Sequence, residues 1–346
     1  VILGLLAAVI GGAFALFAFR SSSLRTGGLF APVSREGALI LNNLLLATAT
    51  VAVLVGTLYP LLLDAFAGQT ISVGAPFFDL TFGAIMAPLL VILPFGPFLA
   101  WKRADLIAVT QRLAWVAGLA VFVTVLVFAL RGGTVSLAPL GLLLGVWVAL
   151  GAVAELFDRA KFFRTDVMTS MRRLFGLPRT AWATAIAHFG LGVSVIGIVA
   201  ASAWQSELVT TMTQGQTVEI ADYTVTFDGL ARVMGPNYQS DQGRFTIADP
   251  NGTSRVSLPE RRLYVASGQP TTEAAIETYG FSQLYLQLGE AGQGEAQVVR
   301  LWYKPFVTLI WLGAVIMAGA GFLSLSYRRL RVGAPTPAAR QPVAAE

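Results

Sequence analysis

The sequence predicts an α-helical polytopic membrane protein with about seven transmembrane helices and a small β-rich periplasmic domain between the last two. Of the 346 residues, 55% are hydrophobic and 12% are charged, whereas soluble domains carry about 25% charged residues. Several apolar stretches reach the roughly 20 residues that a helix needs to cross a bilayer. In so apolar a chain, the net charge of +5 does not indicate nucleic-acid binding.

Seven spans are expected, at 1–19, 39–63, 80–100, 106–130, 134–157, 180–203 and 305–327. Residues 1–203 would then form a transmembrane region of six spans, and residues 328–346 a disordered, Pro- and Ala-rich tail. The chain starts inside an apolar stretch without Met or a basic segment, so we expect a fragment and not a signal peptide.

The Lys and Arg residues of the short loops predict the orientation. Loops on one side, together with the tail, carry sixteen of these cations, whereas the short loops at 64–79 and 131–133 carry only Arg131. Cytoplasmic loops are enriched in Lys and Arg. We therefore expect the first residue on the periplasmic side of a bacterial inner membrane and the C-terminus and tail in the cytoplasm.

The 204–304 segment is expected to be a β-rich periplasmic domain. Alternating polar and apolar residues predict strands at 217–228, 243–248 and 263–265, with turns at 235–237, 249–252 and 267–270. A short capped helix is expected at 271–277. Arg261 and Arg262 could bind an anionic group, although a solvated surface pair is the simpler interpretation.

His188 is the first candidate for chemistry, because it is the only histidine and the chain has no cysteine. It lies inside the apolar sixth span, where an ionisable group is a candidate functional residue. It could be an axial ligand of a haem held between helices, or a structural histidine bonded to a neighbouring helix. Met86, Met212 and Met317 are conceivable second ligands, and none stands out.

The second predicted span has two polar features, Ser34 just before it and the pair Asn42 and Asn43 within it. Ser34 is suited to cap the second span, and Asn42 and Asn43 lie about a turn into it, where each amide needs partners. Hydrogen bonds between helices are the simpler explanation for both asparagines. The chain contains no phosphate-binding loop, no zinc-protease motif and no hydrolase nucleophile motif.

The sequence resembles the C-terminal half of the CcmF/NrfE family, the membrane subunits of bacterial cytochrome c haem lyase. The resemblance is carried by an ordered set of motifs that covers nearly the whole chain. The motifs are Ser-Arg-Glu at 34–36 with Asn42 and Asn43, 56–60, 71–78, Ala-His-Phe-Gly at 187–190, 235–237, 259–264, 272–276, 303–307 and 310–313.

The resemblance implies that His188 is an axial ligand of a haem b, with the second axial ligand outside this chain. It implies haem reduction by quinol through the embedded haem, followed by thioether bonds between the substrate haem and the Cys-x-x-Cys-His thiols of apocytochrome c. The implied partners are a periplasmic haem chaperone, apocytochrome c, other haem lyase subunits, quinol and membrane lipid, but no nucleic acid. No catalytic residue is assigned, and this chain alone would hold an incomplete site.

Two other functions are compatible with the residues. One is the core of a transporter or permease, for which Pro88, Pro94 and Pro97 would break the third span, but no matching repeat is present. Solute transport without bound haem would favour it. The other is a non-catalytic assembly scaffold with 204–304 as a docking surface. Partners that still co-purify after deletion of 204–304 would argue against that docking role.

Overall fold

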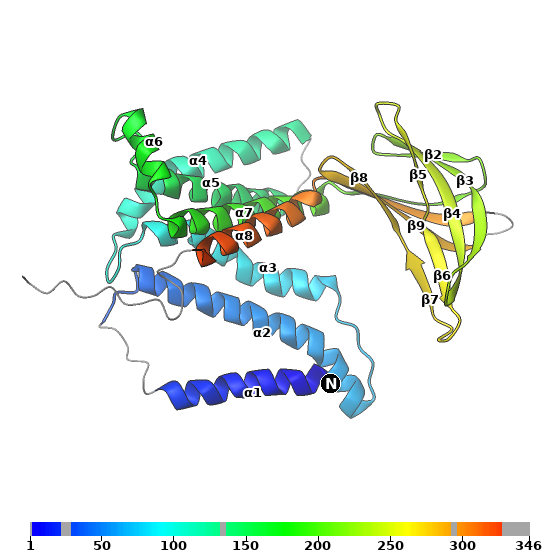
Figure 1. Ribbon diagram of the computed structural model, residues 1–346, viewed down its shortest axis with the longest axis horizontal. Helices are drawn as coiled ribbons and strands as arrows, with labels where there is room; N and C mark the ends of the chain where they lie inside the picture. Colours follow the sequence, from blue (N-terminus) through cyan, green and yellow to red (C-terminus); the bar gives the residue numbers. More distant parts are fainter. Residues whose placement is uncertain (1, 22–28, 132–135, 292–295, 327–346) are drawn as a thin grey trace, which may run out of the picture.

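The computed structural model describes residues 2–21, 29–131, 136–291 and 296–326 and contains a helical bundle with a β domain at one end (Figure 1). The helices are α1 (Ile2–Arg20), α2 (Arg35–Ala67), α3 (Ala75–Ile92), α4 (Leu106–Arg131), α5 (Ala138–Ala160), α6 (Val167–Phe175), α7 (Arg179–Ala203) and α8 (Thr308–Leu325). A 3₁₀ helix, η2 (Leu93–Phe98), continues α3. The tail expected at 328–346 lies outside the described residues.

Within the described ranges, seven helices are long and apolar enough to cross a membrane, which confirms the predicted fold class. The largest difference in extent is α2, which has 33 residues against the 25 expected and continues through Pro60. The three prolines of the third span do not all break its helix. Its α-helical part continues through Pro88, and Pro94 and Pro97 lie in η2, where the missing proline N–H groups interrupt the α-helical bonds.

The first turn of α2 is fixed to the segment that precedes α4. Ser34 caps α2 as predicted, because its side chain accepts a bond of 3.0 Å from the N–H of Gly37. The N–H of Arg35 donates to the carbonyl of Ala100 at 3.0 Å, and the N–H of Ala104 donates to Val33 at 2.9 Å. The beginnings of α2 and α4 therefore lie at the same end of the bundle.

Glycines bring α7 close to both α5 and α8. A Cβ atom on Gly192 would lie 2.7 Å from the backbone nitrogen of Ala149 in α5. On Gly197, a Cβ atom would lie 2.7 Å from the backbone nitrogen of Ile310 in α8. Small residues allow such backbone contacts between membrane helices. The Ser194 hydroxyl adds a bond of 3.0 Å to the carbonyl of Ile310, so α5, α7 and α8 form a tightly packed unit.

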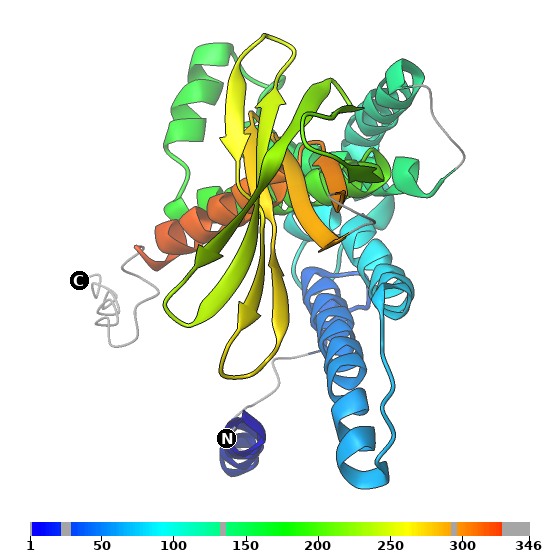
Figure 2. The same ribbon diagram turned by 90° about the vertical axis from the view of Figure 1, so that its right-hand side faces the viewer.

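The β domain between α7 and α8 consists of two antiparallel sheets (Figure 2). One has the strand order β1-β10-β9-β8, and the other β2-β3-β4-β6-β7 with β5 also paired to β4. The strands are β1 (Ser206–Met212), β2 (Thr217–Ile220), β3 (Tyr223–Met234), β4 (Tyr238–Ala248), β5 (Ser254–Ser257), β6 (Glu260–Tyr264), β7 (Pro270–Glu273), β8 (Ala275–Tyr279), β9 (Ser282–Ala291) and β10 (Gln297–Lys304).

The two sheets enclose one apolar core. Phe227 and Phe245 from one sheet meet Leu286 and Leu301 from the other, and all four side chains are buried. The two phenylalanine rings lie 4.9 Å apart between their centroids, a favourable aromatic contact. The chain enters this domain from α7 and leaves it into α8, so the sheets extend beyond the end of the helical bundle (Figure 1).

The helix predicted at 271–277 is wrong, because this segment forms β7 and the start of β8. Thr272 pairs with Arg261 of β6, and Ile276 pairs with Tyr285 of β9. The segment therefore passes from one sheet to the other, and its backbone groups pair with the preceding strand β6 and the following strand β9. Pairing with these neighbouring strands overrides the helix-capping signal within the segment.

The short helix α6 was not predicted from the sequence. Asp166 caps it by accepting the N–H of Thr169 at 2.9 Å, and this bond holds the pKa of the Asp166 carboxyl below its usual value. The helix contacts α5 at the end of the bundle opposite the β domain (Figure 1). Its apolar side chains Val167, Met168 and Phe175 are exposed, and its last turn contains two arginines. Helix α6 therefore has the composition of an amphipathic helix that lies at a membrane interface.

Candidate functional site

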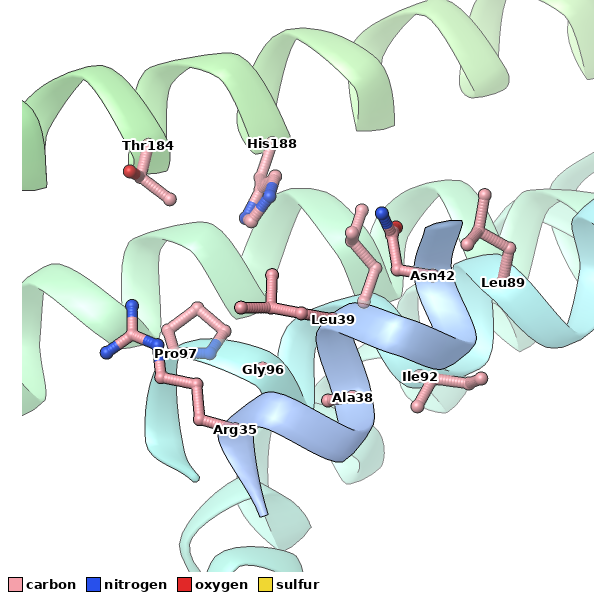
Figure 3. A pocket seen from close by; sticks show the side chains of 11 residues that line it. Arg35, Ala38, Leu39, Asn42, Leu89, Ile92, Gly96, Pro97, Thr184 and His188 are labelled. Atoms are coloured by element: carbon pink, nitrogen blue, oxygen red, sulfur yellow. The ribbon is translucent and has the colours of Figure 1, made fainter. Parts of the chain in front are cut away.

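His188 lines a cavity of about 300 Å³ between α7, α2 and the α3–η2 segment (Figure 3). This volume is at the lower end of the roughly 300–1,000 Å³ typical of small-molecule sites. The walls are mainly apolar, as expected for a site inside a membrane bundle. The lining residues are Arg35, Ala38, Leu39 and Asn42 from α2; Leu89 and Ile92 from α3; Leu93, Gly96 and Pro97 from η2; and Thr184 and His188 from α7.

The packing of α7 directs His188 into this cavity. Residues two positions apart in an α-helix point about 200° away from each other. Gly190 accordingly faces α8, where an added Cβ atom would lie 2.8 Å from the carbonyl oxygen of Gly313. Thr184, one turn before His188, lines the same cavity. Helix α7 thus packs against α8 through Gly190 and presents its imidazole to the other side.

The imidazole of His188 has no hydrogen-bond partner among the residues that the structure describes. The structural alternative, a histidine bonded to a neighbouring helix, would require such a partner. An imidazole inside an apolar bundle without one has a nitrogen available for a ligand that is not part of this chain. This arrangement suits the coordination of a metal centre by the ring.

Asn42 also reaches the cavity, and its partner differs from the expected one. Its side-chain amide donates to the Oδ1 of the adjacent Asn43 at 3.3 Å, and not to another helix. Because the bond joins neighbours on α2, it does not connect helices. Asn42 therefore contributes a polar group to the cavity wall beside the apolar side chains of Leu39 and Leu89 (Figure 3).

Arg35 supplies the only charged side chain among the eleven lining residues. Its guanidinium carbon lies 5.0 Å from the centroid of the Trp101 ring, which is within the range of a cation–π contact. The sequence identifies Arg35 only as a loop cation and as part of the Ser-Arg-Glu motif at 34–36. Thr184 could have been recognised from its spacing of four residues before His188, but nothing in the sequence places Arg35 beside α7.

The cavity residues could hold one face of a haem, but they supply only one ligand for its iron. The cavity offers one unpartnered imidazole, apolar walls and a cation, which match the iron, the ring and the anionic edge of a haem. The rest of the described chain adds no histidine and no thiolate, nor any group of three metal-binding side chains. A second axial ligand would have to come from outside this chain.

The methionines considered as second ligands do not line this cavity. Met212 is buried in the core of the β domain. Met317 lies in α8 against the Gly190 side of α7, away from the cavity. Met86 is in α3 but is absent from the cavity walls. The structure therefore brings none of the three close to His188 as a lining residue.

The arginine pair of the β domain is engaged in ion pairs. The Nε of Arg262 lies 2.8 Å from an oxygen of Glu260, and the Nη2 of Arg261 lies 3.5 Å from Glu290. The Arg262 guanidinium and the Gln242 amide hold the pKa of the Glu260 carboxyl below its usual value. Both guanidinium groups are half-buried and have partners within the chain, so neither requires an external anion.

Fold and site together define a class of protein: a multi-pass membrane protein with an inserted β-sandwich and a histidine-lined cavity among its helices. Residues 203–305 match the family described as "CcmF C-terminal beta-sandwich". The chain belongs to the CcmF family of cytochrome c biogenesis proteins.

Two curated relatives and one solved structure illustrate the relationship. The chain is 51% identical over 338 residues to the cytochrome c-type biogenesis protein CycK of Rhizobium meliloti strain 1021, covering 97% of this chain and 50% of the relative. It is 34% identical over 336 residues to CcmF of Escherichia coli K12, covering 95% and 50%. The solved structure of "Cytochrome c Heme Lyase CcmF" superposes with a TM-score of 0.66 at 22% identity, covering 86% of this chain and 46% of that one.

The solved structure confirms the arrangement of helices and β domain, and at this identity it supports the fold alone. The chain spans about half the length of the curated relatives that it matches. The activity, substrates and partners of a whole haem lyase therefore belong to a proposal for this chain.

Proposed function

We propose that this chain contributes one half of a haem b site to a cytochrome c haem lyase, with His188 as one axial ligand of the iron. The observation that carries the proposal is the unpartnered imidazole of His188 in an apolar-walled cavity between α7 and α2. The relatives are named as cytochrome c-type biogenesis proteins, and cytochrome c biogenesis is the biological setting of the proposal. The second axial ligand would come from outside this chain.

The residues that line the cavity would have different roles in binding the haem. His188 would offer a neutral ring nitrogen to the iron, which requires that it carry no proton at that atom. Leu39, Leu89 and Ile92 would enclose the ring and exclude water. When bound, a bis-histidine haem supplies one-electron exchange between its ferric and ferrous states. The chain itself offers no thiol, so the thiols that form the thioether bonds would be those of the substrate.

The proposed reaction joins the vinyl groups of a substrate haem to the two thiols of a Cys-x-x-Cys-His segment in apocytochrome c. Quinol would be the electron donor for reduction of the substrate haem iron to the ferrous state, and the haem b held by His188 would supply the one-electron exchange that this reduction needs. A periplasmic haem chaperone, apocytochrome c and other haem lyase subunits would be the partners. No residue of this chain is assigned to the thioether chemistry itself.

The test uses the full-length protein purified from membranes. We expect a reduced-minus-oxidised spectrum of a b-type haem that organic solvent extracts, together with restored covalent cytochrome c in a strain that lacks the endogenous lyase subunit. Covalent haem on the cytochrome is detected by haem staining after denaturing electrophoresis. Restored cytochrome c without any b-type haem in the purified protein would disprove the haem site.

We also infer that the β domain faces the periplasm of a bacterial inner membrane and that the beginnings of α2, α4 and α7 face the cytoplasm. The loop cations support this orientation. Lys102 and Arg103 precede α4, and Arg172, Arg173 and Arg179 precede or begin α7. All lie at the bundle end opposite the β domain, which follows the end of α7, and cytoplasmic loops favour such residues.

Because the chain contains no cysteine, single cysteines can report this orientation. In intact cells with a permeable outer membrane, a membrane-impermeant maleimide should label Asn251→Cys in the β domain and leave Arg103→Cys unlabelled. Both positions are exposed, so burial does not explain a difference. Lysis should then expose Arg103→Cys to the reagent. The reverse labelling pattern would overturn the orientation.

A further inference from the structure

The cavity beside His188 has a charged end and an uncharged end. Arg35 begins α2 and Thr184 precedes His188 by one turn of α7, and both lie at the same end of the cavity (Figure 3). Asn42 lies two turns further along α2, with the imidazole between it and that end (Figure 3). A ligand that spans the cavity therefore meets a cation at one end and a neutral amide at the other.

The guanidinium of Arg35 has its hydrogen-bond donors available. The guanidinium carbon lies over the Trp101 ring, and the guanidinium N–H groups donate no hydrogen bond to any residue that the structure describes. Within the described part of the chain, no carboxylate lies within 4.0 Å of it. The neighbouring Glu36 is engaged elsewhere, because it accepts the backbone N–H of Lys102 at 2.8 Å.

Nearby groups strengthen the positive character of this end. Arg35 is the first residue of α2, and the N-terminus of a helix adds a partial positive charge. The hydroxyl of Thr184 donates to the carbonyl of Thr180 at 3.0 Å, so Arg35 supplies the hydrogen-bond donors here. Glu155 of α5 attracts Arg35 only from a distance, and its own close partner is Arg159 at 2.8 Å.

We propose that Arg35 binds a carboxylate of the ligand that His188 coordinates, namely a propionate group of the haem. This inference rests on the proposed function. A guanidinium beside apolar walls is stabilised by an anion that the ligand brings, and arginine can bind a carboxylate through two parallel N–H bonds. The anionic edge of the haem then lies toward Arg35 and Thr184, at the end of the bundle opposite the β domain. Arg35 is thereby the residue that selects the orientation of the ring.

The test compares iron protoporphyrin IX with its dimethyl ester, in which both propionates are neutral. Full-length protein stripped of haem is titrated with each compound and followed by absorbance. We expect the wild type to bind the free acid about tenfold or more tightly than the ester, as for a hydrogen bond to a charged group. Arg35→Gln should lose that preference and keep its affinity for the ester, and Arg35→Lys should keep part of the preference.

Arg103→Gln is the matched control, since Arg103 is an exposed arginine in the segment before α4 and does not line the cavity. It should keep the full preference for the free acid. Equal binding of acid and ester by the wild type overturns the role of Arg35 and leaves the haem site intact. Loss of ester binding in both Arg35 variants also overturns it, because that result assigns Arg35 to packing. Failure of the wild type to bind either compound instead disproves the proposed haem site.

Discussion

Replacing His188 by alanine is expected to abolish the b-type haem spectrum of the full-length protein. The imidazole is the only one in this chain, and the cavity walls hold no other side chain that binds haem iron well. One axial position would be left without a protein ligand, and the bound fraction after purification should fall to near zero. Absorbance and the haem-to-protein ratio measure the effect.

Two further variants separate coordination from packing. Phe189→Ala changes the adjacent residue of α7, which is exposed and does not line the cavity, and should retain the haem spectrum. His188→Gly leaves room for free imidazole, which should restore a bis-nitrogen spectrum when added at millimolar concentration. An unchanged spectrum in His188→Ala would remove the axial-ligand role. Loss of the spectrum in Phe189→Ala to the same extent would point to a general disturbance of α7.

The membrane spans were predictable because their signal is local. A run of about 20 apolar residues has few alternatives to a transmembrane helix, and the seven runs correspond to seven helices in the described chain. Helix α6 was missed because its nine residues are too short and too polar for that signal. The segment at 271–277 was misread because its strand partners, Arg261 and Tyr285, cannot be identified from the segment itself.

The candidate site was predictable only in part, because most of its residues come from segments far from His188 in the sequence. His188 is conspicuous by its chemistry, as a single imidazole in an apolar run. The other walls of its cavity come from α2, α3 and η2, about 90 to 150 residues earlier in the chain. Arg35 becomes part of the site only because its segment is bonded to the one before α4, at Ala100 and Lys102. The sequence identifies the candidate ligand His188, and tertiary packing determines which side chains surround it.

Replacing Gly313 by valine should separate α8 from α7 and destabilise the bundle that positions His188. A Cβ atom at this position would lie 2.7 Å from the backbone nitrogen of Ser194, and a backbone cannot move aside as a flexible side chain can. The hydrogen bond of 3.0 Å from the Ser194 hydroxyl to Ile310 would be strained as well. Overpacking of this kind typically costs about 1–3 kcal/mol and sometimes more.

Gly319→Val is the matched control, because it makes the same change six residues later in α8, where a Cβ atom would meet nothing within 4 Å. The two substitutions have the same intrinsic effect on the helix, so their difference isolates the contact with α7. Thermal unfolding of the purified full-length protein should show a lower midpoint for Gly313→Val alone. Haem affinity should fall with it, since Gly190, two residues from His188, packs against the carbonyl of Gly313. Equal midpoints for the two variants would mean that the α7–α8 contact does not hold His188 in place.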